Sequence, residues 1–311
     1  MLTYLFAALA ACANATASVL QRRADAKEPD ELNLSFRLIL DLLRRPMWFL
    51  GVLAVIAGFL LQALALSQGA LAVVEPVLVF ELPVTLVLAA RIFHRRLHKR
   101  EWSAALAITI GLAGLLYFLA PSGGTSKGVP AMVWVVGIVA NLVLVGGLVL
   151  WARRSGSGSG QRAALLGVAT GASFGLTAAL MKAMTQAYAQ GFAHIFVTWQ
   201  TWAMIAAGIL AMFLLQSSLN AGPLVAAQPG ITAADPVVSI VWGVTAFGEQ
   251  VRGGLWLLLV VASAAVAAWG VVMLSRSELI SGQNADQASG SQEEDRPGSS
   301  SRDTCRVPPG P

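Results

Sequence analysis

The chain is a succession of long apolar segments separated by short polar and basic ones. A helix needs about 20 apolar residues to cross the hydrocarbon core of a bilayer. In lipid the backbone polar groups must be satisfied within the chain, and a helix satisfies them. We therefore expect an all-α integral membrane protein with about nine transmembrane helices, at 2–20, 47–67, 70–92, 102–120, 131–151, 163–184, 194–215, 223–247 and 255–274.

Composition agrees with membrane insertion and excludes several other classes. Hydrophobic residues make up 56% of the chain and charged residues 12%, whereas soluble proteins carry about 25% charged residues. Two cysteines, Cys12 and Cys305, cannot build a disulfide framework. The sequence has no zinc-protease, nucleophile-elbow, phosphate-loop or dinucleotide motif. We expect no enzyme, no cofactor and no nucleic-acid partner. The first apolar run lacks a preceding basic region, so we expect a retained helix.

The basic residues predict the orientation. If the connections alternate sides, one side receives 18 lysines and arginines, and the other receives only Lys127, Lys182 and Arg252. Without the C-terminal tail the ratio is 14 to 3. Because basic loops stay in the cytoplasm, we predict a multi-pass protein of the cell (inner) membrane, with its N-terminus outside and its C-terminus inside.

Two segments lie outside the predicted spans. Residues 34–45 place leucines on one helical face and charges on the others, which predicts a short helix on the cytoplasmic membrane surface. Residues 275–311 are rich in Ser, Gly, Gln and Pro. Such a composition cannot bury enough apolar area to fold, so we expect a disordered cytoplasmic tail.

A proline pattern occurs twice. Glu75-Pro76 and Pro83 return 153 residues later as Gln228-Pro229 and Pro236, and an acidic residue lies just before the second proline of each tract. Further landmarks return at 154 residues: Gln62 with Gln216, Phe93 with Phe247, and Trp102 with Trp256. We predict two four-helix repeats, 1–120 and 163–274, joined by a linker helix within 121–162.

An odd number of linking helices starts the second repeat on the opposite side of the membrane. The repeats are then inverted, as in many secondary transporters, whose substrate sites lie at broken helices near the midplane. The segment 163–184 also carries glycines at four-residue spacing: Gly167, Gly171 and Gly175. Such a ridge permits close helix contact. We favour packing within one chain, with a homodimer interface as the alternative.

Four polar residues in these tracts are the candidate substrate or ion site. A charged side chain in hydrocarbon costs about 2.5–3.5 kcal/mol, so retained ones are usually functional. At 1.5 Å per residue, Glu75 and Gln228 lie about 9 Å deep, Glu81 about 17 Å and Asp235 about 20 Å. Glu81 and Asp235 thus fall near the midplane. The helix breakers, which free backbone carbonyls, are Pro76, Pro83, Pro229 and Pro236.

Carboxylates together with freed carbonyls suit a cation or a proton. Mg²⁺ keeps several waters and needs only one or two carboxylates, so its candidate ligands are Glu75, Glu81 and Asp235. Asn14, Trp199 and Gln200 are further candidates for the pathway.

Three other polar residues have simpler interpretations. We expect Lys182 to reach the membrane surface from a helix end. Glu249 is expected to be solvated and His194 to be interfacial.

The residues also resemble a known family. The run from Arg44 to Pro83, followed by the basic segment 91–100 and Glu101-Trp102, resembles the drug/metabolite transporter (DMT, EamA-like) superfamily. Ser18-Val19-Leu20-Gln21 before a basic pair is similar to its NIPA-like magnesium-transporter branch. Ala246-Phe247-Gly248-Glu249 matches the Gly-Glu element that ends the penultimate helix, but the first copy has Phe93-His94-Arg95 at that place.

The resemblance covers about residues 1–275 and implies transport of a small solute by alternating access, through a site between the helices at 70–92 and 223–247. Three functions stay open. The first is a transporter of small organic solutes in which carboxylates relay protons. The second is a permease for Mg²⁺ or another divalent cation. The third, of another class, is a membrane scaffold that transports nothing.

Overall fold

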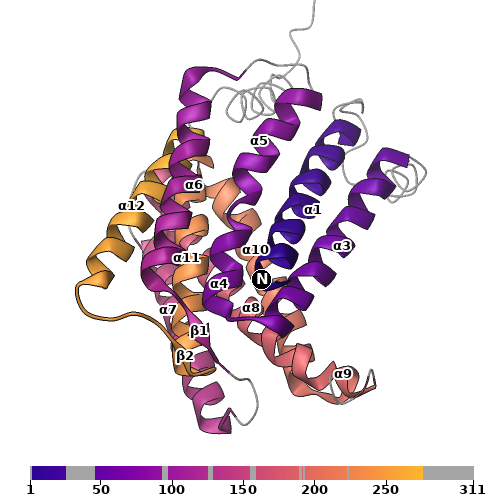
Figure 1. Ribbon diagram of the computed structural model, residues 1–311, viewed down its shortest axis with the longest axis vertical. Coiled ribbons are helices and arrows are strands. Elements are labelled where there is room, and N and C mark those ends of the chain that lie inside the picture. Colours follow the sequence, from indigo (N-terminus) through magenta and orange to yellow (C-terminus); the bar gives the residue numbers. More distant parts are fainter. Residues whose placement is uncertain are drawn as a thin grey trace, which may run out of the picture.

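The computed structural model describes residues 2–25, 46–92, 97–124, 129–154, 159–188, 191, 193–222 and 224–275. These residues are almost entirely helical (Figure 1). The helices are α1 (Leu2–Asp25), α3 (Pro46–Gln68), α4 (Leu71–Leu78), α5 (Glu81–Ile92), α6 (Lys99–Leu119), α7 (Ala131–Arg154), α8 (Ser159–Tyr188), α9 (His194–Val197), α10 (Trp199–Ala221), α11 (Leu224–Thr245) and α12 (Trp256–Ser275). Two short strands, β1 (Ser122–Gly123) and β2 (Glu249–Gln250), pair in antiparallel fashion.

The architecture is that of a multi-pass membrane protein. Within the described ranges, eight helical segments are long and apolar enough to cross a bilayer. The helix α11 has 22 residues and is not among the eight. Each of the nine predicted segments contains a helix. The predicted surface helix at 34–45 and the tail beyond Ser275 lie outside the described residues.

Two predicted segments are each divided into two helices. Residues 70–92 form two helices, α4 and α5, instead of one. The segment 194–215 begins with the short α9, and α10 then runs on to Ala221.

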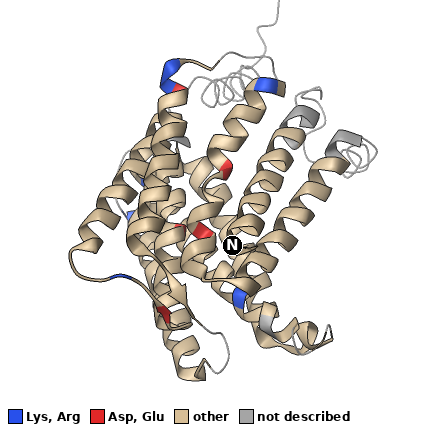
Figure 2. Cartoon of the chain, viewed as in Figure 1, with Lys and Arg blue, Asp and Glu red and all other residues tan. Residues whose placement is uncertain are grey.

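The two ends of the bundle differ. We call the end that carries β1, β2 and the α3–α4 turn the β-face, and the opposite end, where α5 ends and α6 begins, the basic face. Arg91 and Lys99 lie at the basic face. Figure 2 shows that the helices between the two ends carry few charged residues. This distribution is what a hydrocarbon environment requires.

The central helix is α8, which packs against α11, α10, α7 and α3. Its glycines lie against α11. A Cβ atom at Gly167 would collide with the carbonyl oxygen of Ala227, and one at Gly171 would collide with that of Ile231. The ridge therefore packs within the chain, as predicted.

The two halves of the chain have matching neighbours. In the first half α1 packs against α3 and against α4 and α5. In the second half α8 likewise packs against the next two long helices, α10 and α11. Between the halves, α4 packs against α11 and α6 packs against α12.

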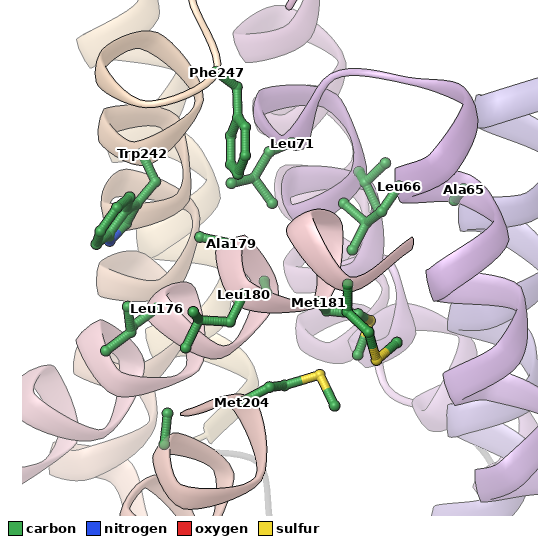
Figure 3. Close-up of a cluster of buried hydrophobic side chains, with 14 of the residues drawn as sticks. Ala65, Leu66, Leu71, Leu176, Ala179, Leu180, Met181, Met204, Trp242 and Phe247 are labelled. Atoms are coloured by element: carbon green, nitrogen blue, oxygen red, sulfur yellow. The ribbon is translucent and has the colours of Figure 1, made fainter. Parts of the chain in front are cut away.

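An apolar cluster fills the space beneath the β-face (Figure 3). Leu176 and Leu180 of α8 belong to it, together with Leu71 of α4 and Trp242 of α11. Phe247, which is 1% exposed, covers this cluster from the segment after α11. The cluster joins side chains from the two halves.

Candidate functional site

An acidic pair lies where α4 meets α11, with Glu75 buried and Asp235 partly exposed. Glu75 of α4 is 4% exposed, and its Oε1 accepts a hydrogen bond of 3.0 Å from Nε2 of Gln62. Asp235 of α11 lies close enough to Glu75 for the two carboxyl groups to interact electrostatically. Since α4 belongs to the first half and α11 to the second, this pair lies between the halves.

The other polar groups of α11 bond within their own helix. Asp235 Oδ1 accepts a hydrogen bond of 3.4 Å from the hydroxyl of Ser239, which is fully buried. Gln228 Nε2 donates to Thr232 Oγ1, also at 3.4 Å. Both bonds join residues four apart, one helical turn. Gln228 is therefore held along α11 by its own helix.

Glu81 lies in a second polar group, at the start of α5. Its Oε1 accepts a hydrogen bond of 3.4 Å from Ser18 Oγ of α1. Asn14, one turn before Ser18, also bonds the Glu81 side chain. The structure thus brings Asn14 to one of the predicted carboxylates. All three side chains are partly exposed.

The structure gives the two acids predicted near the midplane different partners: Asp235 interacts electrostatically with Glu75, whereas Glu81 interacts with Ser18 and Asn14 of α1. Glu81 lies two residues before Pro83, whereas Asp235 lies one residue before Pro236. One residue turns an α-helix by about 100°. Relative to the second proline, the two acids are therefore offset by one residue, and Glu81 is also the first residue of a separate helix, α5.

The three predicted magnesium ligands do not form one cluster. Among the described residues, no group of three or more His, Cys, Asp and Glu side chains could hold a metal ion. A cation bound at Glu75 and Asp235 would complete its coordination with water or backbone oxygens.

An apolar groove of about 400 Å³ lies between α5 and α6. Its lining includes Phe80, Pro83, Leu106 and, at the basic-face end, Arg91. None of the candidate carboxylates lines it. The groove is therefore separate from the acidic pair.

A second charged cluster lies at the β-face. The Lys182 ammonium of α8 is 2.5 Å from Oε1 of Glu249 and donates to the Gly69 carbonyl oxygen at 3.0 Å. The Glu249 carboxylate also accepts hydrogen bonds from the backbone N–H groups of Leu71 (2.6 Å) and Ala72 (2.9 Å). Lys182 is 4% exposed and Glu249 3%.

The local sequence explains why Glu249 binds there. The first N–H groups of a helix lack intrahelical partners, and Ala70, which precedes α4, has no side-chain acceptor. Glu249 supplies the acceptor from the other half of the chain. Gly248 has φ +63°, a conformation that favours glycine, and Gly243 leaves room for the carboxylate.

Two sequence-based expectations about this cluster are wrong. Glu249 is buried rather than solvated, and Lys182 is buried rather than extended to the membrane surface. A signal was available, because a lysine inside an apolar segment requires a partner. Gln62 was also missed as a functional residue, although it is a polar group within a predicted span.

The predicted pathway residues of α10 lie near the β-face. Trp199 is 47% exposed and packs edge-on against Trp134, with ring centroids 5.5 Å apart. Within the described part of the chain, Oε1 of Gln200 is buried without a hydrogen-bond partner. His194 is exposed, consistent with an interfacial position.

Comparison with known proteins adds a relative of similar length. The chain is 29% identical over 259 residues to an uncharacterized protein of Corynebacterium glutamicum, and the match covers 82% of this chain and 88% of that protein. No family model matches the chain. No solved structure matches it either.

Proposed function

We propose that the protein is a secondary transporter that moves a small solute across the membrane by alternating access. Its site lies between α4–α5 and α11. The observation that carries this proposal is the acidic pair of Glu75, which is buried, and Asp235, which is partly exposed, between helices from the two halves of the chain. Membrane-embedded carboxylates usually mark an ion or substrate pathway.

The electrostatics of the pair favour a role in ion coupling. Two carboxylates close together in a low-dielectric interior repel each other strongly. Binding of a proton or a cation removes that repulsion. The pair therefore has a free energy that depends on ion occupancy, which is what coupled transport requires.

The arrangement of the helices supports alternating access. Two halves with matching neighbours can exchange conformations if they are inverted copies. The helix α4 begins beside Glu249, which follows α11, so α4 and α11 run in opposite directions, as an inverted pair would. We include membership of the drug/metabolite transporter superfamily in the proposal on the basis of the resemblance described above.

A divalent cation such as Mg²⁺ is the second candidate cargo. Two neighbouring carboxylates, with the Gln62 amide next to one of them, offer the oxygen ligands that Mg²⁺ prefers. A membrane scaffold without transport would have no use for this acidic pair, and we place it last.

Transport assays with purified protein in vesicles test the proposal. We expect Glu75→Gln and Asp235→Asn to reduce uptake to background across a panel of amino acids, amines, nucleosides and divalent cations, with the variants still inserted in the membrane. The matched control is Glu101→Gln, because Glu101 is also buried but bonds the His98 N–H in its own helix. Unchanged uptake in both site variants would refute the proposed site.

Two further measurements separate proton coupling from Mg²⁺ transport. Uptake that requires a pH gradient supports the first. Mg²⁺ as cargo predicts that Mg²⁺ raises the melting temperature of the wild type and not of the Glu75→Gln variant, since a ligand stabilises only the state that binds it.

A further inference from the structure

The carboxylate of Glu249 joins the two halves of the molecule at the β-face. Its partners Leu71 and Ala72 belong to the first half, as does Gly69, which Lys182 binds. Lys182 and Glu249 belong to the second half.

These contacts control the position of α4. Glu249 binds the first N–H groups of this eight-residue helix, where the backbone carries a partial positive charge. Glu75 follows Leu71 by four residues, about one helical turn. A displacement at the start of α4 therefore moves Glu75 relative to Asp235.

We propose that Glu249 is a positioning residue and a latch: with Lys182 it holds the start of α4 in the state in which the β-face is closed, and it releases α4 when that face opens. This inference rests on the proposed transport function. It adds a residue outside the acidic pair that determines which face of the molecule is open.

A buried charged contact suits a latch better than an apolar one. The ions of a buried pair lose their hydration, and this desolvation offsets much of their attraction. When the β-face opens, water again reaches the carboxylate and the ammonium. The apolar cluster of Leu71, Leu180 and Phe247 beneath the latch gains nothing comparable from water.

The latch belongs to one face. At the matching place in the first repeat the sequence reads Phe93-His94-Arg95, without a glutamate. Loss of the latch should therefore shift the equilibrium toward a state open at the β-face.

Cysteine accessibility tests the latch without knowledge of the substrate. In a background with Cys12→Ser and Cys305→Ser, a reporter cysteine replaces Ala179 of α8, which is 0% exposed and belongs to the cluster beneath the latch. Its matched control replaces Ala169, also 0% exposed and on α8, but packed against Val145 and Leu214. The probe is a small membrane-impermeant methanethiosulfonate.

We expect Glu249→Gln to accelerate labelling of the Ala179→Cys reporter at least about tenfold, which corresponds to a tenfold shift in the closed-to-open equilibrium. Labelling at the control site should not change. Equal reporter labelling in the wild-type background and in a folded Glu249→Gln variant overturns the latch.

Two double variants separate the latch from a purely structural ion pair. Lys182→Met with Glu249→Gln leaves no unpaired charge, so it should fold better than either single variant and still be labelled fast. The exchange of Lys182→Glu with Glu249→Lys restores the pair, but an ammonium cannot accept N–H bonds. Fast labelling of this exchange supports the capping role, and wild-type labelling refutes it.

The outcomes also separate the latch from the transport site. If Glu249→Gln accelerates labelling and Glu75→Gln leaves transport unchanged, the latch stands and the proposed site is wrong. If Glu75→Gln abolishes transport and the Glu249 variants are labelled at the wild-type rate, the site stands and the latch is wrong.

Discussion

The two proline tracts share their spacing and differ in their structure. In the first tract the helix breaks at Val79-Phe80, where Phe80 N–H bonds Val77 O at 3.0 Å and Leu82 N–H bonds Val79 O at 3.1 Å. Each of these bonds reaches back three residues, as in a 3₁₀ turn, instead of four as in an α-helix. In the second tract α11 runs from Leu224 to Thr245 without a break, with Pro229 and Pro236 inside it.

Neighbouring helices account for the difference. The glycines of α8 let α11 lie against one straight partner from Ala227 to Val238. In the first tract α4 and α5 both pack against α1, and α4 packs against α11 and α8 as well. A proline removes one backbone donor, and tertiary packing decides whether the helix then continues.

The polar partners of the tracts differ as well. Gln62 donates to Glu75 of the first tract, whereas its sequence counterpart Gln216 is exposed. The start of α4 is capped by a residue from the other half. The first tract therefore depends on the second half for its position, and the following tests examine that dependence.

The largest expected effect comes from replacing Lys182, whose positive charge compensates that of Glu249, the residue that caps α4. We expect Lys182→Met to lower the free energy of unfolding by about 3–5 kcal/mol, because Glu249 is left buried without its counter-ion. Arg252→Met is the control, since Arg252 is exposed. Denaturation in detergent measures both, and equal stability of the two variants would contradict the structure around α4.

A smaller effect is expected from α8, and it tests why α11 stays straight. Gly171→Val should lower the free energy of unfolding by about 1–3 kcal/mol, because the new side chain pushes α11 away. Gly147→Val on α7 is the matched control, since a Cβ there meets nothing within 4 Å. A control as destabilising as the test variant would show that packing against α11 is not the cause.

A comparison of single prolines sharpens the contrast between the tracts. Pro236→Ala places a new N–H inside a continuous helix and should stabilise it by about 1 kcal/mol. Pro83→Ala lies in the first turn of α5, where an N–H has no intrahelical partner, so we expect no gain. Thermal melting measures the stability of both variants. An equal rise in melting temperature for both would contradict the view that tertiary packing causes the break in the first tract.

A final test does not concern stability and measures the side of the membrane on which the C-terminus lies. In a Cys12→Ser background, Cys305 should react with an impermeant maleimide only after the cells are permeabilised. Reaction on intact cells would reverse the predicted inside location of the C-terminus.

Hydropathy and length predicted a chain of long apolar helices, and eight such segments are found in the described residues. A membrane span must be apolar along its whole length and must satisfy its own backbone. The candidate carboxylates were likewise found from the sequence, as charges that hydrocarbon would otherwise exclude. The break between α4 and α5 could not be predicted from the prolines, because α11 carries prolines at the same spacing and is continuous.

The sequence alone therefore determined the membrane-spanning helices, because these are local properties of composition. Only the tertiary structure decided that Asp235 meets Glu75, that Glu81 faces α1, and that Lys182 and Glu249 are buried together at the start of α4. Each of these contacts depends on how one helix is rotated and shifted against another. That rotation is set by the packing surfaces of both helices, so it cannot be predicted from the sequence of either helix alone.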